Sequence, residues 1–184
     1  MQAYLAALQA ETADNLLQAI TSYEEALLEP RAPLAAFTNL AFLYWEVSYD
    51  FGVQTAFLQA HALPDHAVYT YPAQWRRVLQ LAQQRFPEEV EPHYWHAFFT
   101  EEEAYSNQPS SPFLLADLPA QWSSSFLPSL YRYQHGLATD QAALTQLYQT
   151  VQGASTHKDK WLAHLITSLR FFRGAGKGTT YPSF

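Results

Sequence analysis

Apolar residues recur at intervals of three and four along almost the whole chain, and this spacing limits what the chain can fold into. Because an α-helix turns once every 3.6 residues, side chains spaced in this way share one face. The clearest case lies within residues 13–28, where Gln18, Ser22 and Glu25 fall on the opposite, polar face. The residues that share the apolar face of this segment are Leu16, Ala19, Ile20, Tyr23, Ala26 and Leu27.

The same spacing predicts further helices, and prolines separate several of them. Pro30 and Pro33 are expected to end the first strong helix and to begin the next one. Proline lacks the N–H that a helix interior needs, but it suits the first turn of a helix. No segment shows the alternation of apolar and polar residues that indicates a strand. We therefore expect an all-α protein of about eight to nine helices. The further helices are predicted at residues 34–48, 51–62, 72–85, 88–105, 119–134, 140–151 and 156–172.

A recurrence of about thirty-four residues, the length of one helix hairpin in a helical repeat protein, links two of these segments. In such a hairpin a small residue allows the two helices to approach closely, an aromatic residue fills the gap between hairpins, and a proline closes the turn. The aligned residues are Tyr23 with Phe57, Ala26 with Ala60, and Pro30 with Pro64.

The segment 19–27, Ala-Ile-Thr-Ser-Tyr-Glu-Glu-Ala-Leu, resembles the second helix of a tetratricopeptide repeat almost residue for residue. The resemblance covers about residues 1–64 and implies antiparallel helix hairpins stacked as a short right-handed superhelix. The residues that resemble the first helix of the following repeat are Phe37, Leu40, Ala41 and Tyr44.

A single domain is expected, because one repeat cannot bury its apolar face alone and needs stacked neighbours. The later helices are interpreted as degenerate hairpins, with a different helical packing grafted onto two repeats as the alternative. The expected divisions are a domain at 1–173, with the clearest repeats at 1–64, degenerate hairpins at 65–105 and 113–152 and a closing helix at 155–173, followed by a flexible tail at 174–184.

The resemblance also implies where a partner binds, because the first helices of tetratricopeptide hairpins line a concave groove. On this alignment the groove-facing residues are Thr38, Phe42, Trp45 and Tyr49. Asn39 falls where chaperone-binding members of the family carry an asparagine that holds a carboxylate.

Those chaperone-binding members also carry a lysine and an asparagine in the first repeat, where this chain has Tyr4 and Leu8. The acidic tail of a chaperone is therefore not the expected partner. Arg76 and Arg77 remain candidates for holding a partner carboxylate, because guanidinium groups bind carboxylates through two parallel hydrogen bonds. The leading hypothesis is a non-enzymatic module that binds a peptide or a helix of another protein in the groove.

Composition excludes several other classes of function. The net charge is −7, from ten Lys and Arg against seventeen Asp and Glu, which argues against nucleic acid or an anionic membrane as partner. The absence of cysteine excludes disulfides, thiol nucleophiles and thiolate zinc sites. No apolar run approaches the roughly twenty residues of a membrane span, and residues 1–10 do not read as a signal peptide. We expect a cytoplasmic protein without a cofactor, whose oligomeric state the pattern does not indicate.

The alternative is a metalloprotein or hydrolase that uses a histidine and glutamate cluster. His93, His96 and Glu103 are spaced by three and seven residues, so all three can project from one helix face toward a metal ion. The same helix carries several aromatic residues, which favours a core position for the histidines. No serine-histidine-acid or glycine-elbow pattern is present, so a non-enzymatic protein is preferred.

Overall fold

The computed structural model places helices over most of the predicted segments. It describes residues 1–49, 54–107, 127, 130, 141–153 and 155–174. Within these residues it contains eight helices and no strand, which confirms the predicted all-α fold of about eight helices. The helices are α1 (Gln2–Thr12), α2 (Leu16–Leu27), α3 (Leu34–Tyr49), α4 (Gln54–Ala60), α5 (Ala67–Arg85), α6 (Val90–Asn107), α8 (Gln141–Val151) and α9 (His157–Gly174).

A tight turn joins α1 to α2, and the two helices pack along each other. Asp14 adopts a left-handed φ of 59°, which reverses the chain, and the N–H of Asn15 donates to the carbonyl of Ala10 at 2.9 Å. The Asn15 side chain then accepts a hydrogen bond from the N–H of Gln18 at 3.2 Å. Asparagine is favoured at this position because its side chain satisfies an N–H that the helix itself leaves unpaired.

The second pair of long helices is α3 and α5, with the short α4 in the connection between them. This pairing differs from the thirty-four-residue alignment, which matched α2 with the segment that forms α4. Helix α5 also begins five residues before its predicted start and continues through Pro72. The extra turn is held by burial, because Ala67 is fully buried and the ring of Tyr71 lies 4.6 Å from that of Tyr44.

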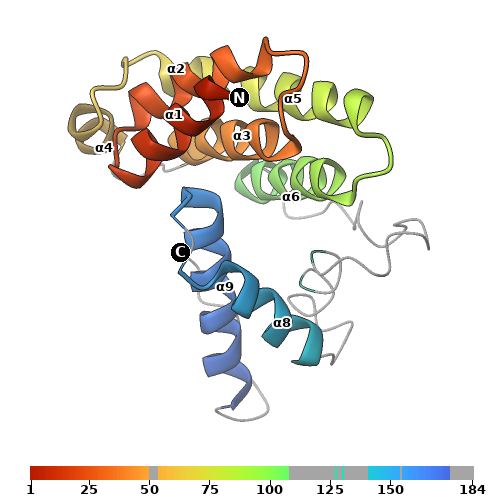
Figure 1. Ribbon diagram of the computed structural model, residues 1–184. Coiled ribbons are helices and arrows are strands. Elements are labelled where there is room, and N and C mark those ends of the chain that lie inside the picture. The colour runs from red at the N-terminus through yellow and green to blue at the C-terminus, as the bar shows by residue number, and fades with distance from the viewer. Residues whose placement is uncertain (50–53, 108–126, 128–129, 131–140, 154, 175–184) are drawn as a thin grey trace.

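The helices form one main layer with two helices beneath it. Figure 1 shows α1, α2, α3, α5 and α6 in the upper layer and α8 and α9 below. Helix α9 starts against α3 and packs along α8. The predicted helix at 119–134 and the tail beyond Gly174 lie outside the described residues, apart from Leu127 and Leu130. The proposed division into repeats therefore stays a prediction.

Aromatic side chains fill the space between α3, α6 and the start of α9. The rings of Trp45 and Phe99 stack with their centroids 4.7 Å apart. The ring centroids of Phe42 and Trp95 lie 5.6 Å apart. Trp161 of α9 lies 5.2 Å from Phe98. Offset and edge-to-face ring pairs of this kind add to the free energy of apolar burial. These aromatic side chains thus form a core and do not line an open aromatic groove.

Candidate functional site

The residues predicted to line a concave groove lie on one face of α3, and that face is covered. Thr38 and Phe42 are fully buried, and Trp45 is 4% exposed. The covering residues come from the start of α9, where the ammonium of Lys158 donates to the hydroxyl of Thr38 at 3.0 Å. Trp161 lies 5.9 Å from Phe42 and 6.0 Å from Trp45, measured between ring centroids. The expectation of an open groove at these residues is therefore not met in this structure.

Asn39 and Tyr49, the other two predicted groove residues, are engaged within the chain. The amide of Asn39 donates to the hydroxyl of Tyr23 at 3.0 Å, and Tyr23 donates in turn to Glu11 at 2.6 Å. The hydroxyl of Tyr49 donates to Glu102 at 2.6 Å. Asn39 thus holds a buried tyrosine of the first hairpin instead of presenting its amide to a partner carboxylate.

Polar contacts around His157 join α9 to α1 and α3. Its ring nitrogens lie 2.9 Å from Glu46 and 3.2 Å from Asp14, and its backbone N–H donates to the carboxylate of Glu11. Burial would lower the pKa of His157, but hydrogen bonding to Glu46 and the charges of Glu46 and Glu11 raise it above its ordinary value. The neighbouring carboxylates therefore favour the protonated form of the ring.

Glu11 is 1% exposed, although it carries a carboxyl group. Burial raises the pKa of Glu11, while the hydrogen bond from Tyr23, the N–H of His157 and the nearby charges of His157 and Lys158 oppose this rise. The carboxylate also lies at the N-terminus of α9, where unpaired N–H groups and the helix dipole favour a negative charge. These contacts account for a glutamate in the core.

Lys158 makes a further polar contact between α9 and another helix, and its side chain is 7% exposed. It forms an ion pair with Glu91 of α6, and the indole N–H of Trp95 donates to the same carboxylate at 3.2 Å. Burial alone would raise the pKa of Glu91, but the charge of Lys158 and the hydrogen bonds to Lys158, Trp95 and Thr38 lower it. A buried charge of this kind needs its partner, so loss of either residue of the pair would leave the other without compensation.

The two predicted arginines have different surroundings. Arg76 forms an ion pair with Glu103 of α6, and its guanidinium carbon lies 4.6 Å from the centroid of the Trp75 ring. Arg77 is exposed, and within the described part of the chain it makes no hydrogen bond or ion pair. Of the two, Arg77 alone is available for an incoming carboxylate.

The alternative metal cluster is not assembled. Among the described residues, no group of three or more histidine and carboxylate side chains is placed to hold a metal ion. Glu103 is engaged by Arg76, and the ring of His96 packs 5.9 Å from that of Trp75. Burial lowers the pKa of both His93 and His96, with the charge of Arg76 adding to the effect at His96. His96 therefore packs against the aromatic core.

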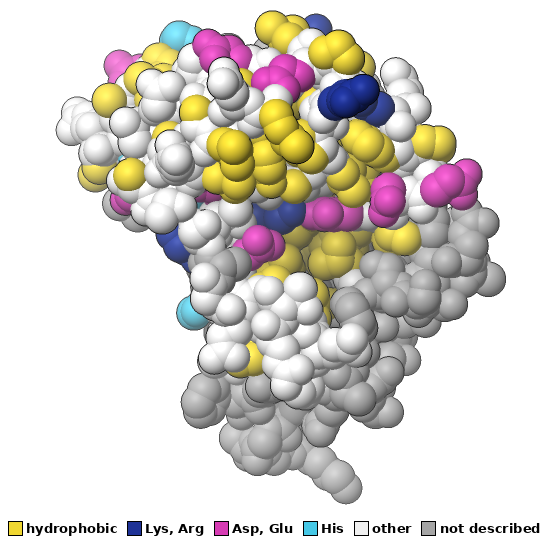
Figure 2. Space-filling view, viewed as in Figure 1, with side chains coloured by type: hydrophobic (Ala, Val, Ile, Leu, Met, Phe, Trp, Pro, Cys, Tyr) yellow, Lys and Arg dark blue, Asp and Glu magenta, His cyan; other side chains and the backbone are white. Residues whose placement is uncertain are grey.

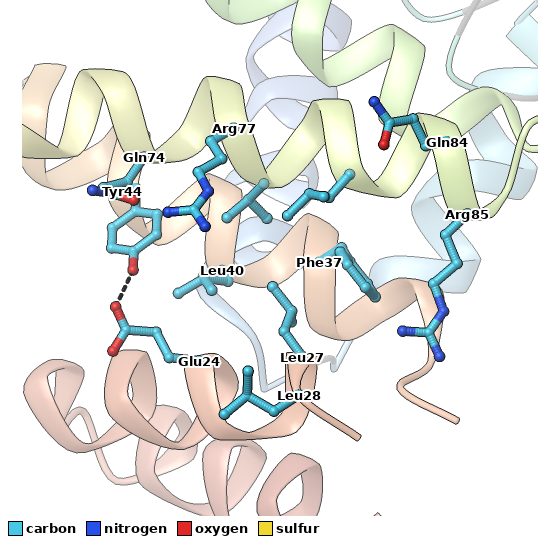
Figure 3. Close-up of a pocket in the computed structure, with 12 residues that line it drawn as sticks. Glu24, Leu27, Leu28, Phe37, Leu40, Tyr44, Gln74, Arg77, Gln84 and Arg85 are labelled. Carbon is cyan, nitrogen blue, oxygen red and sulfur yellow. Dashed lines mark hydrogen bonds between the residues drawn. The ribbon is translucent and has the colours of Figure 1, made fainter. Parts of the chain in front are cut away.

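An open groove lies instead between α2, α3 and α5, with a volume of about 460 Å³. Figure 3 shows Leu40 and Phe37 of α3 at its floor. Leu27 and Leu28 enter from the end of α2, and Arg77 and Arg85 extend over the groove from α5. The remaining lining residues are Glu24, Tyr44, Gln74, Val78, Leu81 and Gln84.

The walls of this groove expose apolar side chains. Leu28 is 85% exposed and Leu81 is 42% exposed. On the face seen in Figure 2, hydrophobic side chains gather over the upper layer of helices, and acidic side chains follow its lower border. Apolar side chains that surround a hollow indicate a binding surface more strongly than single exposed leucines do.

Some of the polar side chains that line the groove already make hydrogen bonds within the protein, and others do not. The hydroxyl of Tyr44 donates to the carboxylate of Glu24. Burial and the charge of Glu24 raise the pKa of Tyr44, whereas the nearby charge of Arg77 lowers it. Arg85 donates to the carbonyls of Glu29 and Pro30. Arg77 is thus the open cation of the groove.

The sequence indicates Arg77 as a binding residue but does not indicate the groove around it. The residues Arg77, Leu81 and Arg85 are spaced by four, so they share one face of α5. The sequence indicates the groove only weakly, because Leu28 follows the last turn of α2. Only the packing of α2 against α3 brings it opposite Leu81.

Comparison of the chain with protein-family models, with curated proteins and with solved structures finds no match. Of the described helices, none is both long enough and apolar enough to cross a membrane.

Proposed function

We propose that the protein is a non-enzymatic interaction module that binds a segment of another protein in the groove between α2, α3 and α5. The observation that carries the proposal is an open apolar groove of about 460 Å³, whose walls expose Leu28 at 85% and Leu81 at 42%. Covering these side chains would remove apolar surface from water, which is the main driving force of association.

The site differs from the one that the tetratricopeptide resemblance implies. The face of α3 with Thr38, Phe42 and Trp45 is occupied by α9, whereas the groove is formed by the other side of the same helix. An occupant of the groove can therefore bind without displacing α9.

Binding of a designed peptide tests the proposal. The peptide is a dye-labelled helix of about sixteen residues with leucines at i, i+3, i+4 and i+7 and one glutamate beside them. Fluorescence anisotropy would give its affinity for the wild-type protein and for Leu28→Glu and Leu81→Glu. Each substitution places a charge on a groove wall and is expected to weaken binding about tenfold or more.

Leu5→Glu is the matched control, because Leu5 is 54% exposed on α1 and does not line the groove. This variant has the same change in charge and is expected to bind as the wild type does. Thermal unfolding of all three variants should stay close to that of the wild type, since the altered side chains are exposed. Equal binding by the Leu28, Leu81 and Leu5 variants would exclude the groove as the site.

A further inference from the structure

The groove has one open charge, and that charge specifies the occupant more closely than its apolar walls do. Arg77 is exposed and makes no hydrogen bond or ion pair within the described part of the chain. In Figure 3 its guanidinium lies beside Tyr44 and above Leu40, at the edge of the apolar floor. A guanidinium in this place offers up to five N–H donors to a group that enters the groove.

The other charged groups of the groove are already engaged. Among the described lining residues, Glu24 is the one acidic residue, and it accepts a hydrogen bond from Tyr44. Arg85 donates to two backbone carbonyls, and its guanidinium carbon lies 5.6 Å from the centroid of the Phe37 ring. With the two guanidinium groups of Arg77 and Arg85 against the single carboxylate of Glu24, the lining carries a net positive charge, which favours a negative group beside Arg77.

The walls indicate the backbone form of the occupant. An extended segment gains affinity by pairing its backbone with the open edge of a sheet, and the described residues contain no strand. The walls and floor are helices, whose backbone groups are paired internally. A helix satisfies its own backbone hydrogen bonds, so it can bury an apolar stripe here without leaving N–H or C=O groups unpaired.

From this geometry we infer that the occupant of the groove is an amphipathic helix of a partner protein that carries an aspartate or glutamate at the border of its apolar stripe. Its leucine-like side chains contact Leu28 and Leu81, and its carboxylate binds the guanidinium of Arg77. This inference rests on the proposed function and names the chemistry of the partner. Arg77 is then the residue that determines specificity, while the leucines provide most of the affinity.

Three peptides that differ at one position test the inference. Each has the leucine stripe described above, and the position beside the stripe is glutamate, glutamine or lysine. Anisotropy titrations of the wild type are expected to give the tightest binding for glutamate, with about threefold to tenfold weaker binding for glutamine and weaker binding again for lysine. The preference should decrease as salt is added, because the pair lies at the rim of the groove.

Arg77→Glu should reverse the order, so that the lysine peptide binds best, and Arg77→Gln should remove the preference. Arg31→Glu is the matched control, because Arg31 is exposed outside the groove and the substitution changes the net charge equally. The control should keep the order of the wild type. Helical circular dichroism of each variant shows that the fold is unchanged.

The possible failures are distinguishable. If the three peptides bind the wild type equally and the Arg77 variants change nothing, while Leu28→Glu still weakens binding, the inference about the carboxylate is wrong and the groove remains the site. If none of the peptides binds the wild type, both the inference and the proposed function are rejected.

Discussion

The carboxylate of Glu11, at the end of the first helix, accepts a hydrogen bond from the backbone N–H of His157, at the start of the last described helix. The same carboxylate accepts the hydroxyl of Tyr23 at 2.6 Å. One buried acidic side chain therefore connects α1, α2 and α9, and through Asn39 it also reaches α3. Through these hydrogen bonds the start of α9 is connected to α3, whose other side lines the groove.

Replacing Glu11 should destabilise the protein. In Glu11→Ala the hydroxyl of Tyr23 and the N–H of His157 lose their acceptor, and each buried unpaired group costs about 1–3 kcal/mol. Urea unfolding followed by circular dichroism measures the change. Glu25→Ala is the control, because Glu25 is exposed on α2, and its effect should stay within about 0.5 kcal/mol. Equal stabilities of the two variants would contradict the role given to Glu11.

The ion pair of Lys158 and Glu91 should show strong coupling. Lys158→Met leaves the part-buried carboxylate of Glu91 without its cation and is expected to lower the free energy of unfolding by about 1–3 kcal/mol. The double variant Lys158→Met/Glu91→Gln should recover part of this loss, because no unpaired charge remains. A double-mutant cycle measures the coupling. Additive effects of the two substitutions would show that the pair does not form.

Stability should depend on pH through His157. The pKa of this residue is raised in the folded protein, so its contribution is complete below the unfolded value of about 6.5 and is lost as the pH rises through the folded value. His157→Gln removes the titration while keeping polar atoms in place. The difference in unfolding free energy between wild type and variant should therefore be larger at about pH 6 than at about pH 8.5. A difference that does not change with pH would contradict this account.

Phe42 and Trp45 should behave as core residues. Phe42 is fully buried and Trp45 is 4% exposed, so Phe42→Ala and Trp45→Ala are expected to cost about 3–5 kcal/mol each. Tyr69→Ala is the control, because Tyr69 is 83% exposed on α5, and it should change stability little. Thermal unfolding measures all three. If the Phe42 and Trp45 variants were as stable as the wild type, these two side chains would not be core residues and would belong to an open surface.

The helices were predictable because their apolar residues repeat with the helical period. The predicted segment 34–48 is α3 (Leu34–Tyr49), and the predicted 140–151 is α8 (Gln141–Val151). Helix α5 begins before the predicted residue 72, because proline is typical of a first turn, whereas burial of Ala67 supports a further turn before Pro72. Local propensity is a weak guide where packing adds apolar burial.

The candidate site was less predictable, because it depends on contacts between distant segments. Glu91 and Lys158 are 67 residues apart, and nothing in the local pattern of either residue indicates that they meet. The apolar face of α3 continues nearly all around the helix, so its sequence does not show which side α9 covers. The residue type of Arg77 indicates a carboxylate-binding residue, but Leu28 lies at the end of α2, and only the tertiary packing brings it to the same groove.

The location of peptide binding distinguishes the groove from the face of α3 that α9 covers. Amide chemical shifts of the isotope-labelled protein, recorded while the glutamate peptide is added, identify the residues that it contacts. We expect the largest changes at Leu28, at the end of α2, and at Arg77 and Leu81 of α5. The signals of Thr38, Trp45 and Lys158 should stay nearly unchanged. Large changes at those three residues, with little change at the groove, would show that the face beneath α9 is the binding site and would contradict the account.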